Sequence, residues 1–320
     1  AKSGLRARLP KWIRLVSGPG CPVCVTSISD LDKAIILSQR DDVIIATYGD
    51  MIRVPGSCSS LQVERAKGNQ IKVVYSSHDA LRLAYEHKDK KIIFLGIGFE
   101  TTAPTIASTV LRAKEEKIKN FFLLSLHKLV PPALQALLTS KELEIDGFIL
   151  PGHVSAIIGA DVYRFISTKY KIPGVIAGFE INDILQAIVM LVKQVVEARA
   201  EVEIGYRRVV TDQGNIIAKK KMALVFRIKD ANWRGIGIIP DSGLSLNDEY
   251  AEFDVDKQFE VKETNLGQAE SDCICGNILR GVKTPLDCPL FSSTCVPDSP
   301  VGPCMVSSEG TCAAYYFQRT

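Results

Sequence analysis

The stretch KIIFLGIGFETT, residues 91–102, shows the unit from which most of this chain is built. An apolar run, Lys91–Leu95, leads into a glycine-rich turn, and a stretch with helical spacing, Pro104–Lys117, follows it. A strand that is apolar along its whole length is typical of a parallel sheet covered on both faces. The stretch therefore predicts one βα unit of a layered α/β fold.

The same unit recurs from residue 13 to about residue 199. The other expected strands are Ile13–Ser17, Val43–Thr47, Ile71–Ser76, Phe121–Leu126, Gly147–Leu150 and Gly174–Ala177. The other expected helices are Ser29–Ser38, Ser59–Lys67 and Asn182–Ala198. This alternation predicts an α/β fold with two similar doubly wound parallel-sheet domains, residues 1–100 and 101–200.

After residue 200 the pattern changes. Residues 201–230 alternate charged and β-branched side chains around the turn Thr211–Asn215, which favours an antiparallel hairpin. The acidic stretch Asp248–Lys262 favours a helix, and six of the nine cysteines lie in the last 48 residues. We expect residues 201–320 to form a third, irregular domain organised by its cysteines.

The composition excludes several classes of protein. Hydrophobic residues at 46% and charged residues at 23% are globular values, so the chain as a whole is not disordered. A net charge of +3 is too small to favour nucleic acid or an anionic membrane as a partner. No apolar run is long enough to span a membrane, and no apolar core follows the basic residues 1–12, so we expect a cytoplasmic protein without a signal peptide.

The unusual motifs of the α/β region all follow predicted strands: GPGCPVC at 18–24, GFETT at 98–102 and PGHVS at 151–155. In open α/β sheets, ligands bind in the crevice at the carboxyl ends of the strands. We therefore expect Cys21, Cys24, Glu100 and His153 to lie at one edge of the fold.

These residues leave more than one chemistry open. Cys21 and Cys24 stand between a strand and a helix, and a helix N-terminus lowers the pKa of a thiol. The pair is therefore a redox dithiol or part of a metal site, with a buried structural pair as the third interpretation. Glu100 is either an acid–base group or a carboxylate at a helix start. His153 lies in a turn, which favours ligand binding or proton handling over a place in the core.

The C-terminal cysteines fit an iron–sulfur site better than a zinc site. Zinc ribbons use two close pairs of ligands, which this segment lacks, whereas a [4Fe–4S] cluster takes four thiolates. The spacing C-x14-C-x6-C-x16-C runs through Cys273, Cys288, Cys295 and Cys312. Cys275 and Cys304 are left over and could form a disulfide beside the cluster. Three disulfides are the structural alternative, which a reducing compartment disfavours.

Four segments, in this order along essentially the whole chain, resemble the HypD family of hydrogenase maturation proteins: GPGCPVC (18–24), GFETT (98–102), PGHVSAIIG (151–159) and the tail from Cys273 through GPCMVSSEGTC (302–312). The resemblance implies two α/β domains and a domain that carries a [4Fe–4S] cluster. It also implies a scaffold that works with the small partner HypC to build the Fe(CN)2CO group of [NiFe]-hydrogenases. Cyanide would arrive from HypE, and the iron unit would pass to the hydrogenase large subunit.

The resemblance also implies a role for each cysteine pair. Cys275 and Cys304 would be a redox pair next to the cluster, and Cys21 and Cys24 would be the dithiol of the crevice and candidate ligands of the carried iron. Glu100 and His153 would line that crevice. The cluster ligands would be Cys273, Cys288, Cys295 and Cys312. HypD proteins have a further cysteine upstream of the GPGCPVC motif, and because this sequence begins after it, we expect a shortened chain.

Three functions are compatible with these features. The first is an assembly scaffold with redox activity, rather than a conventional turnover enzyme. The second is an iron–sulfur thiol–disulfide oxidoreductase that acts through Cys21 and Cys24. The third is a zinc-stabilised binding module, which iron and acid-labile sulfide content would separate from the other two. A stable complex with a small partner, and iron with diatomic ligands, would favour the first function over the second.

Overall fold

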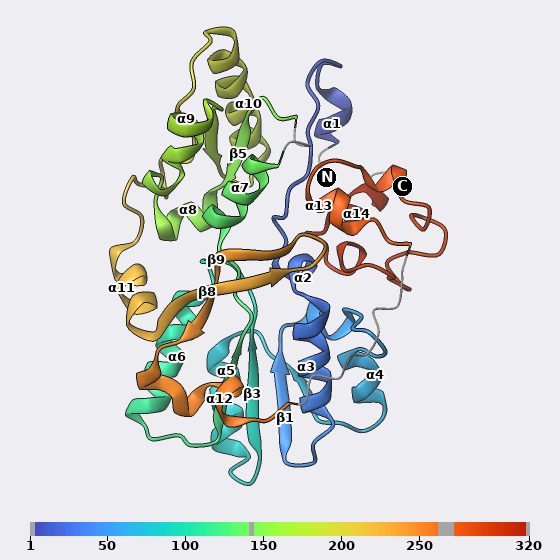
Figure 1. The fold of residues 1–320 in the computed structure, drawn as a ribbon, viewed down its shortest axis with the longest axis vertical. Helices are drawn as coiled ribbons and strands as arrows, with labels where there is room; N and C mark the ends of the chain where they lie inside the picture. Colours follow the sequence, from blue (N-terminus) through green and yellow to red (C-terminus); the bar gives the residue numbers. More distant parts are fainter. Residues whose placement is uncertain (1–3, 141–143, 262–271, 318–320) are drawn as a thin grey trace.

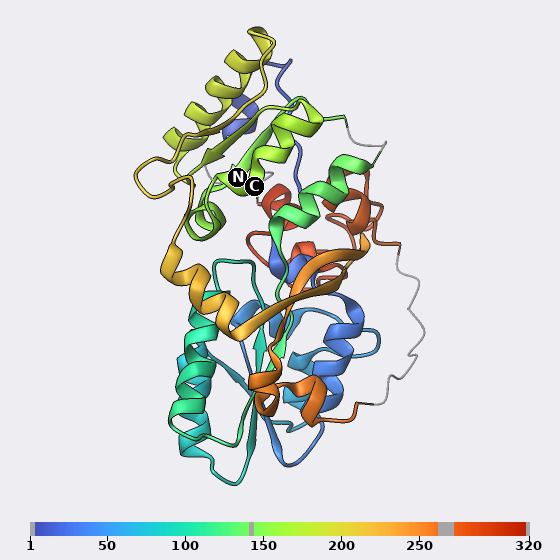
Figure 2. The same ribbon diagram turned by 60° about the vertical axis from the view of Figure 1, so that its left-hand side comes forward.

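The computed structural model describes residues 4–140, 144–261 and 272–317. Two parallel sheets lie toward opposite ends of an elongated molecule, and an antiparallel hairpin crosses between them (Figure 1). The turned view shows the same hairpin, in orange, running across the middle of the molecule (Figure 2). The cysteine-rich segment, in red, lies beside the hairpin and beside helix α2, which is Pro22–Val25 (Figure 1).

The first sheet has four parallel strands in the order β2-β1-β3-β4. They are β1 (Val43–Thr47), β2 (Ile71–Val73), β3 (Lys91–Gly96) and β4 (Phe121–Ser125). Alternate side chains point to opposite faces: Ile44 and Phe94 pack in one core, while Val43 and Ile45 pack in another. The helices over the two faces are α3 (Ile28–Ser38), α4 (Leu61–Ala66), α5 (Ser77–Glu86) and α6 (Ala103–Glu115). Because both faces are covered, the strands are apolar throughout, as the sequence predicted.

The second sheet has three parallel strands in the order β5-β6-β7. They are β5 (Phe148–Pro151), β6 (Gly174–Ala177) and β7 (Val202–Ile204). The helices of this part are α7 (Val130–Thr139), α8 (Gly152–Ile158), α9 (Arg164–Tyr170) and α10 (Ile181–Val196). The prediction of an α/β chain with parallel sheets is confirmed. The strand pairing does not follow the division at residue 100, because β4 lies beside β3 in the first sheet.

One expected strand is wrong. Residues 13–17 have no strand partner and run as an extended segment that follows the short helix α1 (Leu5–Arg8). Arg14 and Val16 are exposed, while the other residues of the segment, Ile13, Leu15 and Ser17, are only partly buried. Apolar content alone suggested a strand here, but no neighbouring strand completes the hydrogen bonds that define one.

The hairpin that was expected around Thr211–Asn215 is also wrong. Residues 202–204 pair in parallel with β6, and Asn215 caps the helix α11 (Ile216–Val225) by accepting from the backbone N–H of Ala218 at 3.0 Å. The antiparallel hairpin lies later in the chain, between β8 (Phe226–Trp233) and β9 (Gly237–Leu246).

The remaining elements are short. The acidic stretch from residue 248 forms two pieces instead of one helix, because Asp254 ends the first and caps the second; its last residue, Lys262, lies outside the described residues. The remaining short elements of the whole described chain are η1 (Gly49–Arg53), η2 (Asp161–Tyr163), η3 (Asp248–Phe253), α12 (Val255–Gln258), α13 (Cys275–Leu279), η4 (Pro285–Asp287), η5 (Pro303–Met305) and α14 (Thr311–Tyr316). Among the described residues, no helix has the length and apolar character needed to cross a membrane.

Candidate functional site around the cysteines

The CPVC motif forms the first turn of α2, and its two cysteines are joined by a disulfide. Cys21 caps the helix: its sulfur accepts a hydrogen bond from the backbone N–H of Cys24 at 3.2 Å. Both side chains are buried. Of the open interpretations, the redox pair matches this oxidised form directly, whereas metal ligation would require its reduction to thiolates.

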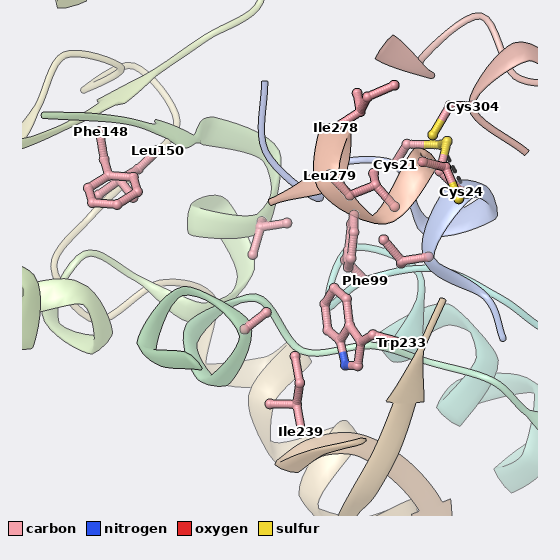
Figure 3. Close-up of a cluster of buried hydrophobic side chains, with 14 of the residues drawn as sticks. Cys21, Cys24, Phe99, Phe148, Leu150, Trp233, Ile239, Ile278, Leu279 and Cys304 are labelled. Carbon is pink, nitrogen blue, oxygen red and sulfur yellow. Dashed lines mark hydrogen bonds between the residues drawn. A yellow bond between two sulfur atoms is a disulfide. The ribbon is translucent and has the colours of Figure 1, made fainter. Parts of the chain in front are cut away.

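The disulfide packs against the cysteine-rich segment. The sulfur of Cys24 lies 3.8 Å from the carbonyl oxygen of Pro303, at the start of η5. The next residue, Cys304, is almost completely buried and lies beside Cys21 and Cys24 in Figure 3. The sulfur of Cys24 is therefore in contact with a backbone segment about 280 positions later in the chain, next to Cys304.

The thiols of the cysteine-rich segment are grouped in pairs. Cys273 and Cys275 are hydrogen-bonded through their side chains, and so are Cys304 and Cys312. The hydrogen bond from Cys273 and the positive charge of Arg234 lower the pKa of Cys275 to about 7, against the effect of its burial. The hydrogen bond with Cys312 and burial raise the pKa of Cys304. The same hydrogen bond with Cys275 raises the pKa of Cys273. Cys273 and Cys304 are thus held in the neutral form more strongly than an ordinary cysteine.

Two glycines allow the chain to fold closely around these thiols. A Cβ on Gly302 would lie 2.6 Å from the sulfur of Cys273, and a Cβ on Gly310 would lie 2.2 Å from the carbonyl oxygen of Cys304. Any larger residue would displace a cysteine or its backbone at these positions. The GPC and EGTC sequences are therefore required by the packing of the segment on its own sulfurs.

The tip of the β8–β9 hairpin lies in the same buried cluster as these cysteines, and this contact was not predicted from the sequence. Trp233 is buried, stacks on Phe99 with ring centroids 6.2 Å apart, and donates from Nε1 to the hydroxyl of Ser242 at 2.8 Å. Figure 3 shows Phe99 and Trp233 lying below the cysteines. The backbone of Trp233 also forms a β-bridge with Thr26, just after α2. The sequence signal for this contact is the Trp-Arg-Gly turn at residues 233–235, between the two segments that pair as β8 and β9.

Glu100 lies in a turn, and its side chain is buried against the start of α7. Its Oε1 accepts from the backbone N–H of Val130, the first residue of α7, at 3.0 Å. Its Oε2 has no hydrogen-bond partner among the described residues. Burial raises the pKa of Glu100 to about 7, although its backbone hydrogen bonds act in the opposite direction. The side chain is therefore both a helix cap and a carboxyl group that can hold a proton near neutral pH.

The hydroxyl of Tyr163 is a second buried polar group near Glu100. Tyr163 has no exposed surface, and its hydroxyl lacks a hydrogen-bond partner within the described parts of the chain. Burial, together with the charge of Glu100, raises the pKa of Tyr163. His153, in contrast, is exposed at the start of α8 and lies against Phe179 with ring centroids 4.3 Å apart. His153 therefore lies in a helix and not in the predicted turn, and its role in ligand binding or proton handling stays a prediction.

Comparison with known proteins identifies the family. The sequence profile described as the hydrogenase formation hypA family, HypD, matches residues 1–319. Hydrogenase maturation factor HypD2 of Bradyrhizobium diazoefficiens is 45% identical, covering 99% of this chain and 85% of that protein. HypD of Azotobacter vinelandii is 46% identical over 98% of this chain and 84% of its own length, and HypD of Escherichia coli is 43% identical over 99% and 85%. The chain belongs to the HypD family.

The donor set of this HypD chain fits an iron–sulfur cluster by its chemistry. Thiolates are the usual ligands of such clusters, and six cysteines lie within one short segment. Electrostatic coupling links Cys295 with Cys273 and Cys312, so these three thiols are close neighbours. Among the described residues no three His, Cys, Asp or Glu side chains converge on a point that could hold one metal ion. A cluster distributes its thiolates over several irons, so it does not need that convergence.

The fold brings together some of the residues that the sequence singled out. Cys21, Cys24, Cys275 and Cys304 belong to one buried cluster, with Phe99 of the GFETT motif in the same cluster. No hydrogen bond in the described part of this HypD chain joins Glu100 or His153 to Cys21 or Cys24. A shared crevice for all of these residues therefore stays a prediction, as do the individual roles of the cysteines.

Proposed function

We propose that this protein is a scaffold and redox factor in hydrogenase maturation, on which the Fe(CN)2CO group of [NiFe]-hydrogenases is assembled. It would act with HypC, receive cyanide from HypE, and pass the iron unit to the hydrogenase large subunit. The single observation that supports this role best is the buried contact between the Cys21–Cys24 disulfide and the segment that carries Cys304. Membership of the HypD family supplies the link to hydrogenase maturation.

The proposed cofactor is a [4Fe–4S] cluster held by Cys273, Cys288, Cys295 and Cys312. Such a cluster, when bound, supplies single electrons at low potential. Cys275 and Cys304 would be the redox pair between it and α2. Support comes from the burial of Cys275 and Cys304 in one core with Cys21 and Cys24. Because these side chains are buried, they have little contact with bulk water, which favours electron transfer over side reactions.

In this proposal the Cys21–Cys24 disulfide at the start of α2 undergoes a two-electron reduction. The Cys21–Cys24 disulfide takes up two electrons and two protons and becomes two thiols, and loss of those protons gives thiolates. Thiolates are soft ligands that suit low-spin iron with diatomic ligands. Capping of α2 by Cys21 places its sulfur at the positive end of the first turn, which favours the thiolate form.

Glu100 is the proposed proton-holding group of the site. Its pKa of about 7 lets Oε2 carry a proton at neutral pH and release it without a large free-energy cost. His153 would line the outer part of the site, where its exposed ring and Phe179 offer a surface to HypC or HypE. We also propose a cytoplasmic location, because the seven free thiols of the described residues suit a reducing compartment.

The decisive test is an infrared spectrum of the anaerobically purified protein co-expressed with HypC. Triple-bond stretching bands of cyanide and carbon monoxide would support the scaffold function. A Cys21→Ala variant should lose these bands and keep its iron and acid-labile sulfide, because the two sites are separate. Loss of iron and sulfide in that variant would contradict this division of roles. The exposed thiol Cys58 provides the matched control, since Cys58→Ala should change neither signal.

The oxidoreductase function is the second candidate, and the disulfide itself favours it. An intact cluster without diatomic bands, together with reduction of a protein disulfide by the wild type, would support this alternative. A zinc-bound protein without iron or sulfide would contradict both functions.

A further inference from the structure

The tip of the β8–β9 hairpin places the backbone of Arg234 and Gly235 between α2 and α13, next to both groups of cysteines. The backbone N–H of Arg234 donates to the carbonyl of Val25, next to Cys24, at 2.9 Å. On the other side, a Cβ on Gly235 would lie 2.5 Å from the Cα of Gly276, so the two backbones touch there. Arg234 is therefore fixed between α2 and the start of α13.

The side chain of Arg234 is held in this position by the chain around it. Its Nη1 donates to the carbonyl oxygen of Pro55 at 3.1 Å, and the residue is partly buried. No carboxylate forms an ion pair with it in the described ranges. The charged or titratable groups that face it are the thiols of Cys275, Cys273 and Cys304 and the carboxylate of Asp32.

Burial and the neighbouring thiols have opposite effects on the pKa of this guanidinium. Burial lowers the pKa of Arg234, whereas the negative charge available on the three cysteines and on Asp32 raises it. A guanidinium with an ordinary pKa above about 12 keeps its charge in spite of such a loss. A permanent positive charge thus lies near these three thiols. Both carboxylate oxygens of Asp32 already accept hydrogen bonds from Ser57, one from its backbone N–H at 2.8 Å and one from its hydroxyl at 2.6 Å.

A fixed cation has a defined effect on a redox centre. Reduction adds negative charge to the sulfurs, and a positive charge in a poorly solvated site stabilises the reduced state more than the oxidised state. We propose that Arg234 is a positioning residue for electron transfer, whose charge favours electron gain by the sulfurs on both sides of it. This inference rests on the proposed redox function of Cys21 and Cys24. In the balanced step the disulfide takes two electrons from a dithiol reductant and one proton, and it gives one thiol and one thiolate, whose negative charge the guanidinium stabilises.

The test measures an equilibrium that does not depend on the cluster. The full protein is equilibrated anaerobically with reduced and oxidised dithiothreitol in fixed ratios, alkylated, and the Cys21–Cys24 peptide is quantified by mass spectrometry. Arg234→Gln should shift the equilibrium at least tenfold toward the disulfide, which is about 30 mV for a two-electron couple. Arg234→Lys should retain most of the wild-type equilibrium, because the charge is kept. Arg227→Gln, an exposed arginine on the same β8 strand paired with Asp248, is the matched control and should leave it unchanged.

The opposite change gives a second, independent variant. Asp32→Asn removes the carboxylate that faces Arg234, so it should shift the same equilibrium toward the dithiol. If Arg234→Gln does not fold, the Asp32→Asn variant tests the inference, and an unchanged equilibrium in it would contradict the inference. Equal equilibria in Arg234→Gln and the wild type would overturn the inference, as would a shift in Arg234→Lys as large as that in Arg234→Gln. Absence of iron, sulfide and diatomic bands from the wild type would instead contradict the proposed function and leave this equilibrium measurable.

Discussion

The first parallel sheet and the cysteine-rich segment 272–317 have almost nothing in common as structures. In β1 and β3 nearly every side chain is buried against hydrocarbon from helices on both faces. In residues 272–317 the helices are a turn or two long, and five of the buried residues are cysteines: Cys275, Cys288, Cys295, Cys304 and Cys312. We therefore expect apolar burial to be enough to specify the sheet, and we expect the segment to depend on the cluster that we propose its thiols bind.

Cys288→Ala should give the largest difference in stability between the first sheet and residues 272–317. Cys288 is a proposed cluster ligand, so its loss should remove the visible absorption of the cluster entirely. Amides of β1 and β3 should keep their protection from hydrogen exchange, because their core contains no cysteine. Amides of α13 and α14 should lose theirs. A retained visible spectrum would refute the ligand assignment, and equal loss of protection in the sheet would refute the independence of the two parts.

Phe94→Ala should have the reverse effect. Phe94 has no exposed surface and lies in the centre of β3, between its pairing partners in β1 and β4. Removing a buried phenyl ring usually costs about 3–5 kcal/mol of unfolding free energy. Urea denaturation followed by circular dichroism measures this loss. The iron and sulfide content of the variant that remains folded should be that of the wild type, and a lower content would mean that the sheet supports the cluster directly.

The same contrast explains what could be predicted from sequence. The strand Gly174–Ala177 was predicted at its observed bounds, because a short apolar run between turn residues has one stable arrangement in a covered sheet. The hairpin was misplaced because the alternation in residues 201–230 reflects an edge strand followed by a helix, and only long-range pairing distinguishes these from a hairpin. Spacing found the cysteines as a group, but spacing carries no information on which thiols touch.

The contacts of Glu100 and Arg234 show a second limit. Both depend on segments that meet only in the folded molecule: Glu100 caps α7, about 30 residues later in the chain, and Arg234 joins Val25 to the surroundings of Cys275. A local motif can suggest that a carboxylate lies at a helix start, but it cannot say which helix. Sequence therefore singled out Glu100, whose role in the site stays a prediction, and missed Arg234 altogether.

Glu100→Gln should change how stability depends on pH. Burial raises the pKa of Glu100 from 4.5 to about 7, so between these values the folded state holds a proton that the unfolded state has released. Stability therefore falls as pH rises through this window, by about 3 kcal/mol at roughly 1.4 kcal/mol per pKa unit. The variant has no proton to lose and should be flat across the window. Urea midpoints on both sides of it measure the difference, and a parallel pH slope in the two proteins would exclude Glu100 as its source.

The smallest effect is expected at the surface of the first sheet's helices. Arg112 of α6 and Glu116, the residue that follows this helix, form an ion pair at 2.8 Å, and their side chains are 52% and 34% exposed. Glu116→Ala removes the pair but leaves the buried face of α6, including Ile106 and Val110, unchanged. Such exposed pairs contribute about 0.3–0.5 kcal/mol, which salt weakens further. Urea denaturation at low and high salt measures it. A loss above about 1 kcal/mol that disappears in salt would mean that charge, and not apolar burial alone, holds the sheet's helices in place.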